Sequence, residues 1–164
     1  MCIRDRDSKE TKAEKLSVIA LKTVDVKGIG YYTLGKKRKE ITEDQINKYN
    51  KVFESYFLKS FTSRLTDYSD PKISVLSAEK INEKYTIVKS MLVKTDKKPE
   101  VKIDWRVYTK NPENPLIRDL IIEGLSLART QKEEFSSILS SNNNDINISN
   151  INISDPHISR LVFP

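Results

Sequence analysis

The spacing of apolar residues changes along this chain from a helical period to a strand period, and this change limits the fold class. Between Thr42 and Phe61 apolar residues recur every three or four positions, and Thr42 with Gln45 has the spacing of a capping box. This pattern predicts a long helix over about residues 43–66 with an aromatic buried face. After Pro71 the spacing changes to that of β-strands. One chain of 164 residues, about the length of a single domain, therefore combines both kinds of element.

Four segments in the second half of the chain have the composition of strands. Residues Val101–Val107 alternate apolar with polar side chains, which indicates a strand with one buried face and places Trp105 on its apolar side. The other three segments lie near Ile73, from Tyr85 to Lys94, and before Glu123, with turn sequences between the last three strands. We therefore predict an α+β fold, in which a twisted antiparallel sheet of about four strands packs against helices.

The segment VDVKGIGYYTLG precedes the long helix and is predicted to be helical itself. Its apolar residues have the spacing of one helical face: Val26, Ile29, Tyr32 and Leu34. Gly35 suits the C-terminal end of such a helix. Gly28 and Gly30 each weaken a helix by roughly 1 kcal/mol relative to Ala, so they indicate close packing or a bend.

The segment DLIIEGLSLARTQKEEF joins a buried strand directly to a helix. Gly124 permits a sharp turn, and Thr130 with Glu133 has capping-box spacing. We predict a helix beginning at Thr130 that folds back against the strand.

Charge and composition exclude several classes of function. The net charge of +6 makes an anionic partner conceivable, but the basic residues are mostly scattered lysines. The single cysteine excludes an internal disulfide and a thiolate metal cluster, and the single histidine, His157, lies in a low-complexity segment that is ill suited to a catalytic triad. The sequence also lacks the arginines interleaved with exposed aromatic residues that nucleic-acid binding on a sheet would require.

Two charged features have a functional and a structural interpretation. Glu123 adjoins apolar residues, where burial would raise the pKa of its carboxyl group and could make it a general base. Capping or pairing at the sheet edge is the favoured alternative. The basic run Lys36, Lys37, Arg38 and Lys39 is either a solvated loop, which is favoured, or a docking site for an acidic surface.

The chain divides into three parts by composition. Residues 1–13 are charged and are expected to be disordered or non-native, with the signal peptide missing. Residues 14–140 form the predicted domain, and residues 141–164 form a low-complexity tail rich in Asn, Ser and Ile.

Four stretches in register resemble the MlaC family, also called toluene-tolerance proteins. They are DVKGIGYYTLG (Asp25–Gly35), the capped helix after it, VKIDWRV (Val101–Val107) and RDLIIEGLSLARTQKEEF (Arg118–Phe135). The resemblance runs over roughly residues 14–140. It implies a non-enzymatic periplasmic phospholipid-binding protein that encloses acyl chains in an apolar cavity, with phospholipid as cargo and no cofactor or metal.

The family resemblance also implies partners and candidate cavity residues. The partners are an inner-membrane MCE-domain complex of an ABC-type lipid transport system and an outer-membrane lipoprotein complex. The matching apolar positions become the candidate lipid-binding residues: Tyr32, Leu34, Phe57, Phe61, Ile103, Trp105, Val107, Leu120, Ile122, Leu125 and Leu127.

Two other functions remain open at this stage. One is a small-molecule enzyme on a similar cone-shaped α+β fold, with Glu123 or Asp104 as its base. The other is a non-catalytic interaction module with a filled core. A large apolar cavity would favour the carrier, converging polar groups would favour the enzyme, and a filled core would favour the module.

Overall fold

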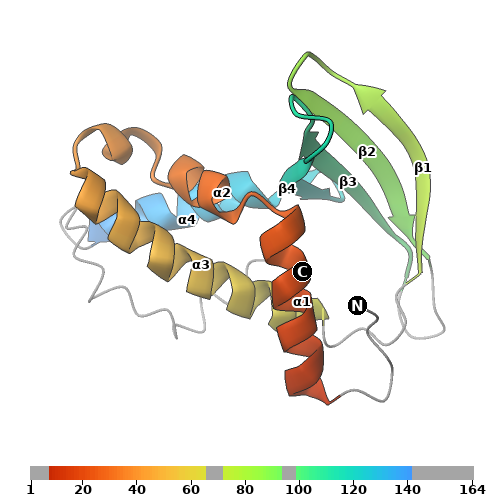
Figure 1. The fold of residues 1–164 in the computed structure, drawn as a ribbon, viewed down its shortest axis with the longest axis horizontal. Helices are drawn as coiled ribbons and strands as arrows, with labels where there is room; N and C mark the ends of the chain where they lie inside the picture. The colour runs from red at the N-terminus through yellow and green to blue at the C-terminus, as the bar shows by residue number, and fades with distance from the viewer. Residues whose placement is uncertain (1–7, 66–71, 94–98, 142–164) are drawn as a thin grey trace.

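The protein is described here by a computed structural model that covers residues 8–65, 72–93 and 99–141 (Figure 1). Helices form the N-terminal part, a meander of strands follows, and one helix closes the described chain. The elements are α1 (Lys9–Thr23), α2 (Val26–Thr33), the 3₁₀ helix η1 (Gly35–Lys39), α3 (Glu43–Leu65), β1 (Ile73–Lys80), β2 (Tyr85–Leu92), β3 (Val101–Tyr108), β4 (Leu116–Ile122), β5 (Leu125–Ser126) and α4 (Leu127–Ser141). The predicted α+β class is confirmed.

The sheet is antiparallel and its spatial order follows the chain, β1-β2-β3-β4-β5. It has one strand more than the four predicted, because the chain pairs with β4 for two further residues after the turn at Glu123-Gly124. Both turn residues have positive φ, 49° and 85°, as a type I′ hairpin turn requires. Gly124 therefore permits the turn as predicted.

Cross-strand pairing divides the sheet into two chemically different faces. Val88, Trp105 and Leu120 lie opposite one another on β2, β3 and β4, and so share what we call the apolar face. Lys89 and Asp104 are paired in the same way on the charged face. The helices contact the sheet chiefly through β4 and β5, and β1 is exposed along its whole length. In Figure 1 the helices accordingly lie at the β4 end, while β1 and β2 curve away from them.

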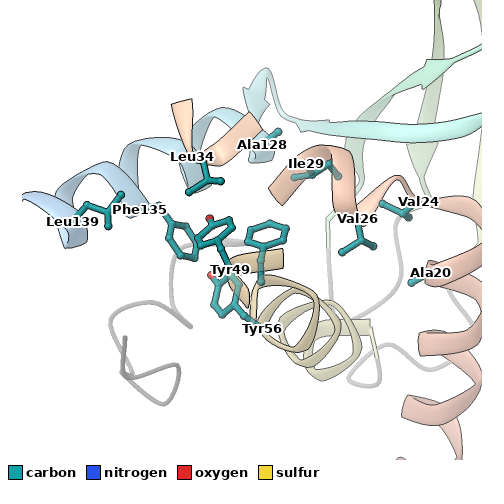
Figure 2. Packing of buried hydrophobic residues seen from close by; sticks show 11 residues of the cluster. Ala20, Val24, Val26, Ile29, Leu34, Tyr49, Tyr56, Ala128, Phe135 and Leu139 are labelled. Atoms are coloured by element: carbon teal, nitrogen blue, oxygen red, sulfur yellow. The ribbon is translucent and has the colours of Figure 1, made fainter. Parts of the chain in front are cut away.

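The core lies between the helices and is built on four aromatic rings. Figure 2 shows Tyr49 and Tyr56 of α3 beside Phe135 of α4. The Tyr49 and Phe135 ring centroids are 5.6 Å apart in an edge-to-face arrangement, which suits aromatic quadrupoles. Phe53 lies 5.8 Å from Phe135. The Tyr49 hydroxyl shares a 2.7 Å hydrogen bond with Thr33, and burial raises the pKa of Tyr49.

Helix α2 approaches α3 closely because Gly30 has no side chain. A Cβ atom at this position would lie 2.8 Å from a ring carbon of Phe53, whose side chain is only 1% exposed. The close packing predicted for this glycine is confirmed. Tyr32 was predicted to lie on the apolar face of this helix, and this was wrong. Thr33 is the buried residue near the end of α2, whereas Tyr32 is 42% exposed.

Two helix starts differ from their predictions and one agrees. The capping box at the start of α3 forms as predicted, since the Thr42 N–H donates to Gln45 Oε1 at 2.9 Å. The start of α4 at Thr130 was wrong: α4 begins at Leu127, and the Thr130 hydroxyl donates to the Ser126 carbonyl inside the helix. The disorder expected up to residue 13 does not hold from Lys9 onward, because the Ser8 side chain caps α1 there. Residues 1–7 and the predicted tail after residue 141 lie outside the described part of the chain.

Replacing Gly30 by Ala should destabilise the protein. The added methyl group must displace the buried Phe53 ring, and overpacking of this kind costs about 1–3 kcal/mol. Alanine recovers up to about 1 kcal/mol through its better helix propensity. Urea unfolding should therefore show a net loss for Gly30→Ala, whereas Lys27→Ala on the exposed side of α2 should stay within about 0.5 kcal/mol of wild type. Equal stability of Gly30→Ala and wild type would contradict the packing described.

Glu134 on α4 should make stability depend on pH. Both of its carboxylate oxygens are buried without a hydrogen-bond partner in the described part of the chain, and burial raises its pKa to about 7. The folded state therefore holds this proton more tightly than the unfolded chain does. The resulting stabilisation is present in full below the ordinary pKa near 4.5 and is lost as the pH rises through 7. Urea midpoints measured from pH 4.5 to 8 should fall less steeply for Glu134→Gln than for wild type or for Glu133→Gln, at the exposed neighbouring residue. Parallel curves for all three proteins would contradict the assignment to Glu134.

Candidate functional site

An apolar pocket of about 280 Å³ lies where the apolar face of the sheet meets α1, α2, α3 and α4. Most of the residues around it are aliphatic or aromatic, and they come from both halves of the chain. The lining residues are Ile19, Thr23, Val24, Ile29, Phe57, Phe61, Trp105, Ile117, Asp119, Leu120, Leu127, Ala128 and Gln131. The change of hydrophobic period along the sequence thus brings a helical wall and a sheet wall together around one space.

Trp105 is held in the sheet wall by its indole N–H. This group donates to Ser90 Oγ at 2.8 Å, and Ser90 Oγ donates in turn to the Ile103 carbonyl at 2.8 Å. Ser90 is fully buried. Because this chain of hydrogen bonds satisfies the only polar atom of the indole, the Trp105 side chain can face an apolar ligand without leaving an unpaired donor.

The helical wall presents a flat aromatic surface. Phe57 and Phe61 lie one turn apart on α3, with ring centroids 5.8 Å apart and planes only 14° from parallel. Stacked rings of this kind bury a large apolar area with little conformational freedom to lose.

The carboxylate that borders the pocket is engaged by the protein itself. Asp119 Oδ1 accepts the Ala128 N–H at 3.0 Å, and Asp119 Oδ2 accepts the Ser126 hydroxyl at 2.6 Å. The start of α4 at Leu127 is therefore capped by two residues, because Ser126 Oγ also accepts the Arg129 N–H at 3.1 Å. Asp119 is 5% exposed and leaves the pocket without an available acid or base from this residue.

Arg118 and Asp25 fasten α2 to the sheet. Arg118 Nε donates to Asp25 Oδ2 at 2.7 Å, and its Nη1 donates to the Tyr85 hydroxyl at 3.0 Å. Asp25 Oδ1 accepts the Gly28 N–H at 2.9 Å and so caps α2. A Cβ atom at Gly28 would collide with the Asp25 carboxylate, which explains why glycine stands there.

The structure brings five of the predicted binding residues into the pocket: Phe57, Phe61, Trp105, Leu120 and Leu127. Ile103 and Val107 share the apolar face with Trp105 but lie outside the pocket lining, and Ile122 packs with Leu127 in a small cluster at the sheet edge. Binding of lipid by these residues stays a prediction.

Three predicted binding residues lie elsewhere. Leu34 is 3% exposed within the helical core, Tyr32 borders a different cleft, and Leu125 is 52% exposed after the turn. Five apolar lining residues were not predicted: Ile19, Val24, Ile29, Ile117 and Ala128. Ile19 could have been found from the amphipathic pattern of its helix, whereas Ile117 reaches the pocket through a β-bulge that its sequence does not indicate.

Neither predicted candidate for a catalytic base faces the pocket. Glu123 is exposed, and its carboxylate accepts the Lys102 N–H at 2.5 Å, which is the pairing at the sheet edge that the sequence favoured. Asp104 lies on the charged face, 3.6 Å from the Lys102 ammonium. Within the described ranges no three potential metal ligands of the His, Cys, Asp or Glu type cluster together.

The predicted basic run forms η1, beside the C-terminal end of α2. Lys37 pairs with Glu40 at 2.8 Å, and the Arg38 guanidinium lies 5.0 Å from the Tyr31 ring centroid. Two of the four basic side chains in this run, Lys37 and Arg38, therefore have partners within the protein. Docking of a partner by this run stays a prediction.

No helix in the described ranges has the length and hydropathy needed to cross a bilayer.

A sequence search finds no matching curated protein. Among solved structures, the fold is similar to that of the phospholipid-binding protein from Ralstonia solanacearum in complex with a phospholipid, with a TM-score of 0.68 and 18% sequence identity. This match covers 82% of the present chain and 76% of the other. The family model described as MlaC protein matches residues 3–152. Because that match spans most of the chain, the protein belongs to the MlaC family.

Proposed function

We propose that this protein is a periplasmic carrier that holds the acyl chains of a phospholipid in the apolar pocket. It passes the lipid between an outer-membrane lipoprotein complex and an inner-membrane MCE-domain complex of an ABC-type lipid transport system. The observation that carries the proposal is a pocket lined by apolar side chains, whose carboxylate and indole groups are satisfied within the protein. Membership of the family and the phospholipid bound to the similar Ralstonia protein support it.

The energetics of acyl-chain transfer fit a carrier. Each buried CH₂ group gains about 0.8 kcal/mol on leaving water, so two chains of roughly 16 carbons gain on the order of 25 kcal/mol. A bilayer offers nearly the same gain. A carrier therefore needs only to match the free energy that the acyl chains gain in a bilayer. An apolar pocket without specific polar contacts is sufficient for that.

The pocket volume indicates where the rest of the lipid would lie. A volume of 280 Å³ is at the lower end of the range of about 300–1,000 Å³ for small-ligand pockets, and a phospholipid with two long chains is larger. The apolar face continues from Trp105 across Val88 to β1, away from the strands that the helices contact. In our proposal the acyl chains extend from the pocket along this face.

A bulky residue at position 19 should exclude the cargo. Ile19 lines the pocket from α1, so Ile19→Trp fills space that the acyl chains would occupy. The matched control is Val18→Trp, because Val18 precedes it on the same helix, is 40% exposed and does not line the pocket. Native mass spectrometry should find phospholipid on freshly purified wild type and Val18→Trp, and several-fold less on Ile19→Trp.

Uptake from phospholipid vesicles provides the second measurement for these proteins. Wild type and Val18→Trp should both acquire lipid, while a folded Ile19→Trp should acquire little. A wild-type protein that is free of lipid and takes none from vesicles would contradict the carrier function. Equal lipid content in all three proteins would contradict the location of the site.

The basic run on η1 is proposed to dock on an acidic surface of the membrane complexes. Changing Lys36, Lys37 and Arg38 to Glu should slow association with the soluble part of the MCE-domain complex at low salt, because opposite charges steer encounter. Stopped-flow measurements should show the defect shrinking as salt is raised, since exposed charges are screened. Equal association rates of the variant and wild type at low salt would contradict docking by these residues and indicate a solvated turn.

A further inference from the structure

A second cleft, of about 590 Å³, lies on the charged side of the sheet. Arg106 lines this cleft, while the neighbouring Trp105 lines the apolar pocket, because successive residues of β3 point to opposite faces. The N-terminal turns of α2 and α4 form its other sides, at Gly28 and Ala128. The cleft is therefore a separate space from the one proposed for acyl chains.

Every basic residue that lines this cleft is an arginine, although lysine is much the commoner cation in the chain. Arg106 comes from β3, Arg118 from β4 and Arg129 from the first turn of α4. Arginine presents a planar fork of N–H donors that binds the oxygens of phosphate or carboxylate two at a time, which lysine does not do. Three such groups from three elements line this one cleft.

These guanidinium groups retain donors for a ligand. The Arg106 side chain makes no hydrogen bond or ion pair in the described part of the chain. Arg118 uses one N–H on Asp25 and one on Tyr85, which leaves three of its five donors. Arg129 pairs with Glu133 at 3.1 Å, but both side chains are largely exposed, and such a pair exchanges readily for a better partner.

The acidic groups near the cleft already have partners within the protein. Asp119 lines it, but its two oxygens accept the Ala128 N–H and the Ser126 hydroxyl. Asp25 is paired with Arg118. The Ala128 and Arg129 N–H groups at the start of α4 are likewise already bonded, to Asp119 and Ser126, so the arginine side chains remain as the donors for a ligand. Tyr32 and Tyr85 also line the cleft.

We propose that this cleft binds a phosphate group, with Arg106 and Arg118 as its principal donors. The phosphate belongs either to a small soluble ester or to the headgroup of a phospholipid. The site is on the opposite face from the apolar pocket, so it does not depend on the carrier function.

The test is calorimetric titration of the purified full-length protein with inorganic phosphate. Arg106→Gln should weaken phosphate binding about tenfold or more, because a charge-assisted hydrogen bond to the ligand is lost. Arg106→Lys keeps the charge without the fork and should recover only part of that loss. The matched control is Lys102→Gln, since Lys102 belongs to the same strand but does not line the cleft, and it should bind within twofold of wild type.

The source of the phosphate is distinguished in an Ile19→Trp background, which keeps lipid out of the apolar pocket. Displacement of phosphate by glycerol 3-phosphate but not by monomeric short-chain phosphatidylglycerol assigns the cleft to soluble esters, and displacement by the phosphatidylglycerol assigns it to headgroups. Absence of saturable phosphate binding, or unchanged affinity in Arg106→Gln, would overturn the proposal. Either result would leave lipid loading of wild type, and hence the carrier function, unaffected.

Discussion

The ion pair between Asp25 and Arg118 is the contact on which the arrangement of helices and sheet depends. It joins the start of α2 to β4 at 2.7 Å, beside a backbone bridge between Val24 and Ile117. Because the pair is partly buried, removing either member would leave a charge without its partner, which costs more than the intact pair contributes. Ile29, one turn into α2, borders both the apolar pocket and the arginine-lined cleft. Polar contacts between the start of α2 and β4 therefore position a wall shared by two chemically different spaces.

The alternation of β3 explains how the two spaces stay separate. Trp105 and Arg106 are adjacent in sequence, yet they face an apolar pocket and a polar cleft on opposite sides of a single strand. A one-residue slip in register would exchange these faces and place a guanidinium group in the apolar pocket. The hydrogen bond from the Trp105 indole to the fully buried Ser90 opposes such a slip, because in the shifted register that donor would lose its acceptor.

Interactions between residues close in sequence were predictable, and those between distant residues were not. The Thr42–Gln45 capping box and the alternation of Val101–Val107 both follow from neighbours within a few positions. The start of α4 was missed because Thr130 was taken as its cap in place of Ser126, and because Asp119 adds a contact from nine residues before the amide that it accepts. Only half of the apolar lining residues of the pocket were predicted. Helical spacing marks Ile19 and Ile29 as apolar, but it does not encode the packing of α1 and α2 against β4 that brings them to the pocket.

The exposed part of the sheet explains why lipid binding and stability should be coupled. Val75 on the apolar face of β1 is 67% exposed, and Ile73 is 45% exposed. Exposure of such apolar side chains to water is unfavourable. In a loaded carrier the acyl chains would cover such residues, and the free energy of that burial would belong to the folded state alone. A ligand that binds only the folded state stabilises it by an amount that grows with its concentration relative to Kd. In the proposed carrier, cargo lying on the remaining strands would not disturb the aromatic core, since the helices contact mainly β4 and β5. The helices therefore hold the aromatic core, while the β1 end of the sheet keeps apolar side chains exposed.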